Sequence, residues 1–224
     1  MKHKIYAICM IVVILTILSA CTSEKRKDFE EIKLTQKQEE DLMEQYAEND
    51  ECHYDEYLPS VRVASCEVFG AECEADTNKG YVYAYVLDGE YVNFKDTAYE
   101  QSGGHMPVKI TVQFAEDSIK LLGSEVMQEG DDLEEALKKM FPRKYYLKCK
   151  KYEANHADGY EKLQKKQEEK IREIWGIPIS EKYSLQLSED GTYEVVWLEE
   201  AELPEESELH IIERGKLERC KSKK

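Results

Sequence analysis

The sequence predicts an α+β fold in which an antiparallel sheet packs with an N-terminal helix and two central helices in a single globular domain. Apolar residues alternate with polar ones in several segments after Pro59, which is the period of a strand with one buried face. Three other segments repeat apolar residues every three or four positions, as amphipathic helices do. The strands are grouped together with the helices beside them, which favours an antiparallel sheet over alternating βαβ units.

The N-terminal helix is predicted from a capping box. Thr35 and Gln38 have the spacing at which two side chains cap each other's backbone N–H groups, and the helix should run to about Glu48. Its apolar face consists of Leu42, Met43 and Tyr46. We expect that face to pack against the sheet.

Several strands should follow Pro59. Residues 61–68 alternate, residues 80–87 are apolar on both faces, and Asp88-Gly89 is a turn signal after which residues 90–94 could return as a hairpin partner. The clearest one-face-buried strand is Val108–Phe114, which turns at residues 115–118 into residues 119–122.

Two central helices are predicted next. Asp131 caps the first, with Glu134 completing the capping box, and Pro142 ends it. Asn155 or Asp158 opens the second, which runs through Trp175. The remaining expected elements are a hairpin of residues 183–187 and 192–198, an edge strand at residues 209–212, and a basic tail at residues 213–224.

The N-terminus has the features of a bacterial lipoprotein signal peptide. Lys2 and Lys4 precede an apolar run of roughly 14 residues, too short for a permanent membrane span, and Leu18-Ser19-Ala20-Cys21 matches a lipobox. We expect residues 1–20 to be removed and Cys21 to carry a covalent diacylglyceryl lipid. Residues 21–34 would then be a flexible tether, and residues 35–212 a domain on the extracytoplasmic face of the cell membrane.

Charge and cysteine content restrict the partners. The formal net charge of −16 repels phosphate, so a nucleic-acid partner is not expected. Cys66 and Cys73 flank a turn expected at Phe69-Gly70, so they are either a disulfide or buried thiols. Their spacing does not match a zinc knuckle, and the sequence predicts no metal site and no cofactor besides the lipid.

Catalytic motifs were not found: there is no His-Glu-x-x-His, Gly-x-Ser-x-Gly or Ser-x-x-Lys pattern, so no catalytic residue is predicted. The most informative local feature is the segment Ser102, Gly103, Gly104 and His105, because two glycines let a backbone approach another group closely. It is either a plain connection between strands or a loop that binds a ligand or partner. Tyr81, Tyr83 and Tyr85 present the same choice between packing under a helix and binding a sugar or peptide.

Four stretches carry a family resemblance: residues 81–87, Glu100–Gly104, Met106–Val112, and Asp131–Pro142 with its Met-Phe-Pro stop. Together they resemble a module of Gram-positive envelope proteins, which occurs outside the membrane in some BlaR-type sensor-peptidase regulators and in stand-alone lipoproteins. The resemblance covers residues 79–175. His105 and the region before Cys73 depart from it. It implies a non-catalytic envelope module that senses or relays, and it supplies no site residues.

Three function classes follow from the sequence. The first is a membrane-anchored binding or sensor lipoprotein of the cell envelope, whose partner is an envelope protein or a wall-derived small ligand. The second is a structural or assembly factor of an envelope protein complex. The third is a hydrolase, which would need a pocket that gathers His105 or His156 with acidic residues of shifted pKa.

Overall fold

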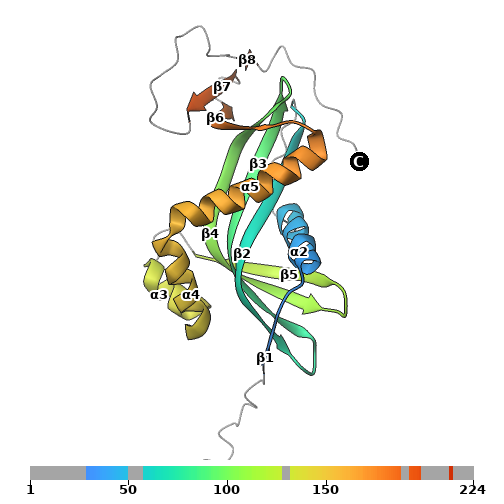
Figure 1. The fold of residues 1–224 in the computed structure, drawn as a ribbon, viewed down its shortest axis with the longest axis vertical. Helices are drawn as coiled ribbons and strands as arrows, with labels where there is room; N and C mark the ends of the chain where they lie inside the picture. The colour runs from blue at the N-terminus through green and yellow to red at the C-terminus, as the bar shows by residue number, and fades with distance from the viewer. Residues whose placement is uncertain (1–28, 50–57, 128–131, 188–191, 198–211, 214–224) are drawn as a thin grey trace, which may run out of the picture.

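Three long antiparallel strands, β2, β3 and β4, form the centre of the molecule, and helix α5 crosses them on one face (Figure 1). The computed structural model describes residues 29–49, 58–127, 132–187, 192–197 and 212–213. Its strands are β1 (Phe29–Ile32), β2 (Ser60–Glu74), β3 (Lys79–Phe94), β4 (Thr97–Phe114), β5 (Ile119–Val126), β6 (Ile179–Leu187), β7 (Thr192–Trp197) and β8 (Ile212–Glu213). Its helices are α2 (Gln36–Asn49), α3 (Leu133–Met140), α4 (Arg143–Ala154) and α5 (His156–Trp175).

The sheet runs in the order β1-β2-β3-β4-β6-β7-β8, and β5 also pairs with β4. Adjacent strands are antiparallel except β4 and β6, which are parallel. This confirms the predicted α+β class, the mostly antiparallel sheet and the single domain. The predicted capping box is present too: Gln38 N–H donates to Thr35 Oγ1 at 3.2 Å, and Thr35 N–H donates to Gln38 Oε1 at 3.0 Å.

Strand alternation sends successive residues of β3 to different cores. Val82, Ala84 and Val86 belong to a cluster with Leu42 and Met43 of α2, which also includes buried residues of β4 and β5. Tyr83 and Tyr85 point to the opposite face, where they contact buried residues of α3 and α4. A third cluster, formed by Val63, Tyr91, Ala98, Ile171 and Ile177, lies under the C-terminal half of α5. The helices therefore cover both faces of the sheet.

The predicted turn at Asp88-Gly89 is wrong. β3 continues through these residues, and Asp88 and Gly89 pair with Gly104 and Gly103 of β4. The chain reverses later, at Lys95 and Asp96, which have positive φ angles of 52° and 58°. Asp-Gly is a frequent turn pair, but here a partner strand with a matching pair of glycines holds it extended.

The predicted tether is too long at its C-terminal end. Phe29–Ile32 forms β1, which pairs with residues 71–74 of β2.

The first of the two predicted central helices is confirmed as α3, but its cap is shifted by one residue. The side chain of Asp132 accepts a hydrogen bond from Glu135 N–H at 2.9 Å. Asp131, the predicted cap, lies outside the described residues. The sequence also missed α4, whose apolar positions are interrupted by lysines.

Of the two alternatives for Cys66 and Cys73, the disulfide is wrong. Cys66 and Cys73 are both free thiols, and they lie in the same strand, β2. Seven residues of extended chain separate two Cα atoms by roughly 23 Å, whereas a disulfide needs about 6 Å. The turn expected at Phe69-Gly70 is a register shift between β2 and β3. Gly70 is required there because a Cβ would overlap the ring of Tyr145.

The C-terminal hairpin is confirmed as β6 and β7. Of the predicted edge strand, Ile212 belongs to β8, which extends to Glu213 of the predicted basic tail. The rest of both segments, together with residues 1–28 and hence Leu18, Ser19, Ala20 and Cys21, lies outside the described residues. Within the described ranges, no helix is long and apolar enough to cross a membrane.

Candidate functional site

The segment Ser102–His105, predicted as a loop, lies inside β4. Ser102 pairs with Glu90, Gly103 with Gly89, Gly104 with Asp88, and His105 with Leu87 of β3. The only irregularity is a register shift beside it, where Tyr91 pairs with Glu100 and Gln101 is the extra residue. The glycines hid the strand from sequence analysis, since a residue without a side chain cannot show alternation.

The outer edge of β4 is open at this segment in the part of the chain that the structure describes. β5 pairs with β4 from Val108 to Phe114, and β6 pairs with it at Ala98 and Glu100. Neither ladder extends into residues 102–107, which we call the β4 window. Six extended residues span about 20 Å. The window is thus a short gap between two strands that occupy the same edge of β4.

The direction of the backbone groups in the window follows from one hydrogen bond. Phe114 N–H donates to Asn78 O, on the β3 side, at 2.8 Å. The pairing of β4 with β3 is uninterrupted from Gln113 back to Ser102, so backbone groups alternate sides from there. The even-numbered residues therefore face β3. Gly103 and His105 direct N–H and C=O outward, and Pro107 directs only a C=O outward because proline has no N–H.

Glu100 lies over the first glycine of the window. A Cβ at Gly103 would be 2.6 Å from Glu100 Oε1 and 2.6 Å from the backbone oxygen of Asp88. Glycine is therefore required at position 103 so that the Glu100 side chain can cover the strand. Burial and the charge of Asp88 raise the pKa of Glu100. Arg62 forms an ion pair with Asp88, and Glu100 forms none with the side chains that the structure describes.

Histidine and tyrosine rings cover the middle of the window on the α5 face. His105 Nδ1 lies 2.9 Å from His156 Nε2, and His105 Nε2 lies 3.2 Å from the hydroxyl oxygen of Tyr152. The His105 ring also contacts the rings of Tyr85 and Tyr160, with centroids 4.5 Å and 5.3 Å apart. Burial, and then the charge of His156, lower the pKa of His105 to about 4. His105 is therefore neutral at pH 7.

This arrangement limits the chemistry of the site. A general base works best with a pKa near the working pH, and a pKa of about 4 makes His105 a weak proton acceptor at neutrality. The described residues contain no group of three or more His, Cys, Asp and Glu side chains placed to hold a metal ion. Two imidazoles, tyrosine rings, one carboxylate and outward backbone groups are instead suited to binding by hydrogen bonds and stacking.

Helices α4 and α5 hold the side chains that surround His105 in place. α4 ends at Ala154 and α5 begins at His156, so Tyr152, His156 and Tyr160 lie at the junction of the two helices. α5 is fixed across the sheet by Gln167, which is 1% exposed. Its amide donates to the carbonyls of Val63 and Leu87 at 3.2 and 3.0 Å, and accepts from the Tyr91 hydroxyl at 2.7 Å.

The tyrosine row of β3 is mainly a packing surface. Tyr83 stacks on Tyr145 of α4 with ring centroids 4.8 Å apart, and both side chains are buried. Tyr85 contacts Tyr152 with centroids 4.9 Å apart. Tyr81 is partly buried under the ammonium group of Lys109, 4.8 Å from its ring centre. Of the three predicted candidates, only Tyr85 reaches the window, through His105.

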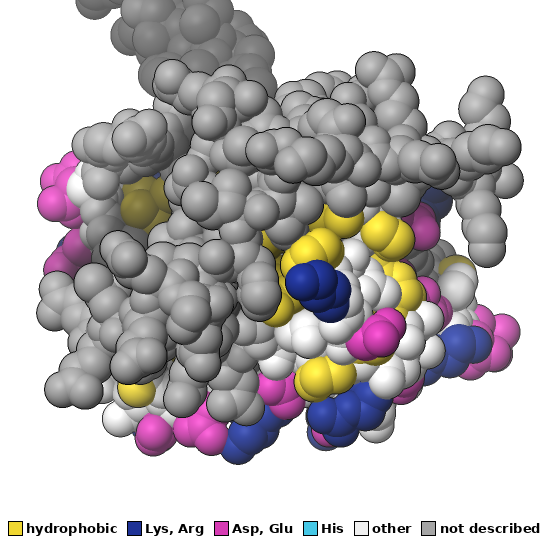
Figure 2. Space-filling model, turned by 90° about the horizontal axis from the view of Figure 1, so that it is seen from above, with side chains coloured by type: hydrophobic (Ala, Val, Ile, Leu, Met, Phe, Trp, Pro, Cys, Tyr) yellow, Lys and Arg dark blue, Asp and Glu magenta, His cyan; other side chains and the backbone are white. Residues whose placement is uncertain are grey.

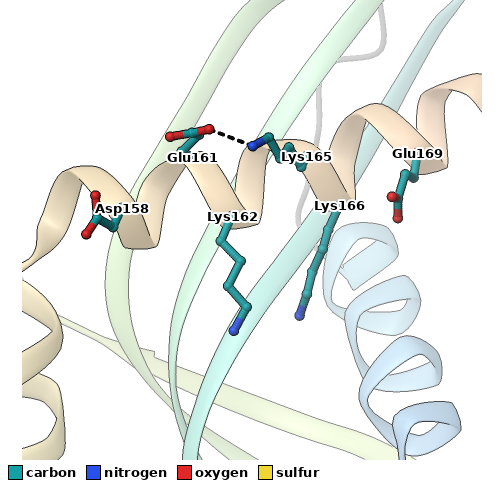
Figure 3. Close-up of a pocket in the computed structure, with 6 residues that line it drawn as sticks. All are labelled: Asp158, Glu161, Lys162, Lys165, Lys166 and Glu169. Atoms are coloured by element: carbon teal, nitrogen blue, oxygen red, sulfur yellow. Dashed lines mark hydrogen bonds and ion pairs between the residues drawn. The ribbon is translucent and has the colours of Figure 1, made fainter.

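A shallow open depression runs along α5 (Figure 3). Asp158, Glu161, Lys162, Lys165, Lys166 and Glu169 line it. Its three lysines are already engaged: Lys162 with Glu67 at 2.5 Å, Lys165 with Glu161 at 2.6 Å, and Lys166 with the Cys66 carbonyl at 3.0 Å. Binding an anion here would require breaking these contacts.

The described part of the surface seen from above shows no patch of a single charge sign (Figure 2). Among the described side chains visible in that view, hydrophobic groups are mixed with both basic and acidic ones (Figure 2). The β4 window is therefore the candidate functional site. Sequence analysis found Ser102–His105 but missed Glu100, Tyr152 and Tyr160 as their neighbours. Sequence analysis considered His105 and His156 separately. The two residues are 51 positions apart in the chain, and the fold brings their rings into contact.

Comparison with protein-family models, with curated proteins and with solved structures gave no match for this chain.

Proposed function

We propose that the protein is a lipoprotein, held on the extracytoplasmic face of the cell membrane by a diacylglyceryl lipid on Cys21. The observation that carries this proposal is the sequence of the N-terminus: Lys2 and Lys4, the short apolar run, and Leu18-Ser19-Ala20-Cys21. β1 begins at Phe29, so seven residues would join the lipidated cysteine to the sheet. Extended fully, they reach about 25 Å, which keeps the domain close to the lipid headgroups.

Lipid attachment is tested with the full chain in a bacterial host that processes lipoproteins. Cells fed an alkyne-bearing fatty acid should label the wild-type protein, and the label should stay with the membrane fraction. Cys21→Ser should lose the label, and Cys73→Ser is the matched control because it removes another free thiol without changing the lipobox. Labelling that persists in Cys21→Ser would refute the proposed anchor.

At the membrane, the domain acts as a non-catalytic binding or sensor module of the cell envelope. The β4 window supports this role, because it places outward backbone groups, two imidazoles and the Glu100 carboxylate around one strand segment whose outer edge has no described partner strand. A ligand that binds only the folded state at 100 times its Kd stabilises it by about 2.7 kcal/mol. Melting of the full chain in detergent micelles, with muropeptides, sugars and peptides added in turn, therefore reports binding.

A hydrolase is the second candidate, and one observation favours it: the fold gathers His105 and His156, as that hypothesis required. The lowered pKa of His105 argues against its use as a base at neutral pH. Turnover of a wall-derived substrate that disappears in His105→Phe, in a variant that melts like the wild type, would favour the hydrolase over the binding module.

A further inference from the structure

We propose that the β4 window binds an extended peptide segment of an envelope protein as an added β-strand, with a Lys or Arg side chain of that segment paired with Glu100. This inference deepens the proposed binding function and rests on it. It names the ligand class, a basic polypeptide segment in extended conformation, and the atoms that receive it.

The first argument is the geometry of the open edge. Exposed strand edges are templates for pairing with another chain, and proteins usually cover them or interrupt them. β4 is covered above the window by β6 and below it by β5, so both neighbours mark the line along which a strand lies. The gap of six residues, 102–107, is long enough for a peptide of about that length. Gly103 and His105 direct N–H and C=O outward, whereas Pro107 is buried.

The second argument is the shape of the window's sides. Side chains of an added strand would point alternately to the two faces of the sheet. On one face they would meet His105, Tyr160 and the exposed His156. On the other they would meet Met106 and the end of β5, where Val126 is 41% exposed. Ser102 and Gly103 are exposed, residues 104–106 are half-buried and Pro107 is buried, so the window is most accessible at Ser102 and Gly103.

The third argument is charge. The Glu100 carboxylate lies over Gly103, on the face that also carries His105. Asp88, the charged group that raises the pKa of Glu100, is of the same sign and is paired with Arg62. Among the described side chains none forms an ion pair with Glu100, so an added strand with a cationic side chain opposite Gly103 would bring an opposite charge. The net charge of −16 also attracts a basic segment before contact.

The test uses the full lipidated chain in detergent micelles and a defined probe, the capped peptide Lys-Val-Lys-Val-Lys-Val. We expect saturable binding by calorimetry and slower hydrogen exchange in the backbone segment that contains Gly103 and His105. The same peptide with N-methyl groups on alternate residues should not bind, because it cannot form the ladder. The peptide Glu-Val-Glu-Val-Glu-Val should bind at least about tenfold more weakly, because it repels Glu100.

Two matched variants separate the role of Glu100 from general charge. Glu100→Gln should weaken binding of the lysine peptide about tenfold, which corresponds to 1.4 kcal/mol. Glu116→Gln makes the same charge change at an exposed position in the turn between β4 and β5 and should leave the affinity unchanged. Equal effects of the two variants would overturn the assignment of Glu100.

Three further outcomes would overturn the inference. The first is that the lysine peptide does not bind at millimolar concentration. The second is that it binds but leaves backbone hydrogen exchange in the window unchanged. The third is that, without peptide, hydrogen exchange in the window slows as the protein concentration rises. The last would show that a second copy of the chain occupies the edge. Failure of the peptide alongside stabilisation by a muropeptide or sugar would leave the proposed binding function standing. The labelling of Cys21 tests the anchor independently.

Discussion

The two halves of β4 have the same partner on one side and different surroundings on the other. Both halves pair with β3 in a single register from Ser102 to Gln113. Residues 108–114 also pair with β5, and Val108, Ile110 and Val112 are fully buried there. Residues 102–107 have no described strand on their outer edge, and two of the six are glycines. One half is built to be buried, and the other is exposed at Ser102 and Gly103 and half-buried from Gly104 to Met106.

This difference teaches that strand formation and strand burial are separate properties. The long ladder with β3 is sufficient to hold the window extended, even though its own residues have low strand propensity. Stability should therefore be concentrated in the paired half, and binding in the open half, as expected where functional segments carry few core contacts. Each of the following predictions tests one side of that contrast.

The largest effect is expected in the paired half. Ile110→Ala removes a fully buried side chain from the cluster with α2 and β5, and should lower the free energy of unfolding by about 2–5 kcal/mol. Urea unfolding measures it. Ser102→Ala, in the exposed window, removes a 3.2 Å hydrogen bond to Glu90 and should cost no more than about 1.5 kcal/mol. Similar losses in both variants would mean that the halves do not differ in this way.

The next effect concerns the helix that lies across the sheet beside the window. Gln167→Leu deprives the buried Tyr91 hydroxyl of its acceptor and the carbonyls of Val63 and Leu87 of a donor. We expect a loss of about 1–3 kcal/mol in urea unfolding. Gln164→Leu, a half-exposed position of the same helix, is the matched control and should be nearly neutral. A neutral Gln167→Leu would show that packing alone fixes α5.

The contrast also explains how far the sequence could predict this fold. Val108–Phe114 was identified because its alternation reports burial directly, and Thr35 and Gln38 because a capping box is local. Asp88-Gly89 and Ser102–His105 were both assigned as breaks in the sheet. Each is held extended by the other, since Asp88 and Gly89 pair with Gly104 and Gly103. A pairing between two segments that each look like turns has no signal in either segment alone.

The candidate site was partly predictable for the same reason. Sequence analysis identified Ser102, Gly103, Gly104 and His105 from their composition, and they do lie in the site. Its walls come from elsewhere: Tyr152 belongs to α4, which was missed, and His156 begins α5. The error over Cys66 and Cys73 has a similar origin, because Phe69-Gly70 looks like a turn in isolation. The requirement for Gly70 comes instead from the Tyr145 ring, 75 positions later in the chain.

Acid should lower the free energy of unfolding through His105 in the β4 window. The pKa of His105 is about 4 in the folded protein, against about 6.5 in an unfolded chain. Between these values the unfolded state binds more protons, so His105 lowers stability as the pH falls from about 6.5 to 4. His105→Phe should reduce this loss. The free energy of unfolding of both proteins is measured in urea at pH 7 and at about pH 5. The comparison removes the contribution of the carboxylates, which both proteins share. Equal losses of stability in the two proteins would contradict the prediction.

The smallest effect is expected on the outer surface of the paired half. Lys109 of β4 lies directly opposite Glu125 of β5, with Nζ 3.0 Å from Oε2, and their side chains are 24% and 56% exposed. Water screens such a pair, so a double-mutant cycle of Lys109→Met and Glu125→Gln should give a coupling of about 0.2–1 kcal/mol. The cycle is needed because Lys109 also contacts the Tyr81 ring, and the single Lys109 variant loses both interactions. The coupling should fall further at 1 M salt, where the screening length is about 3 Å. A coupling that exceeds the cost of Ile110→Ala would mean that charge pairing, and not burial, distinguishes the paired half of β4 from its window.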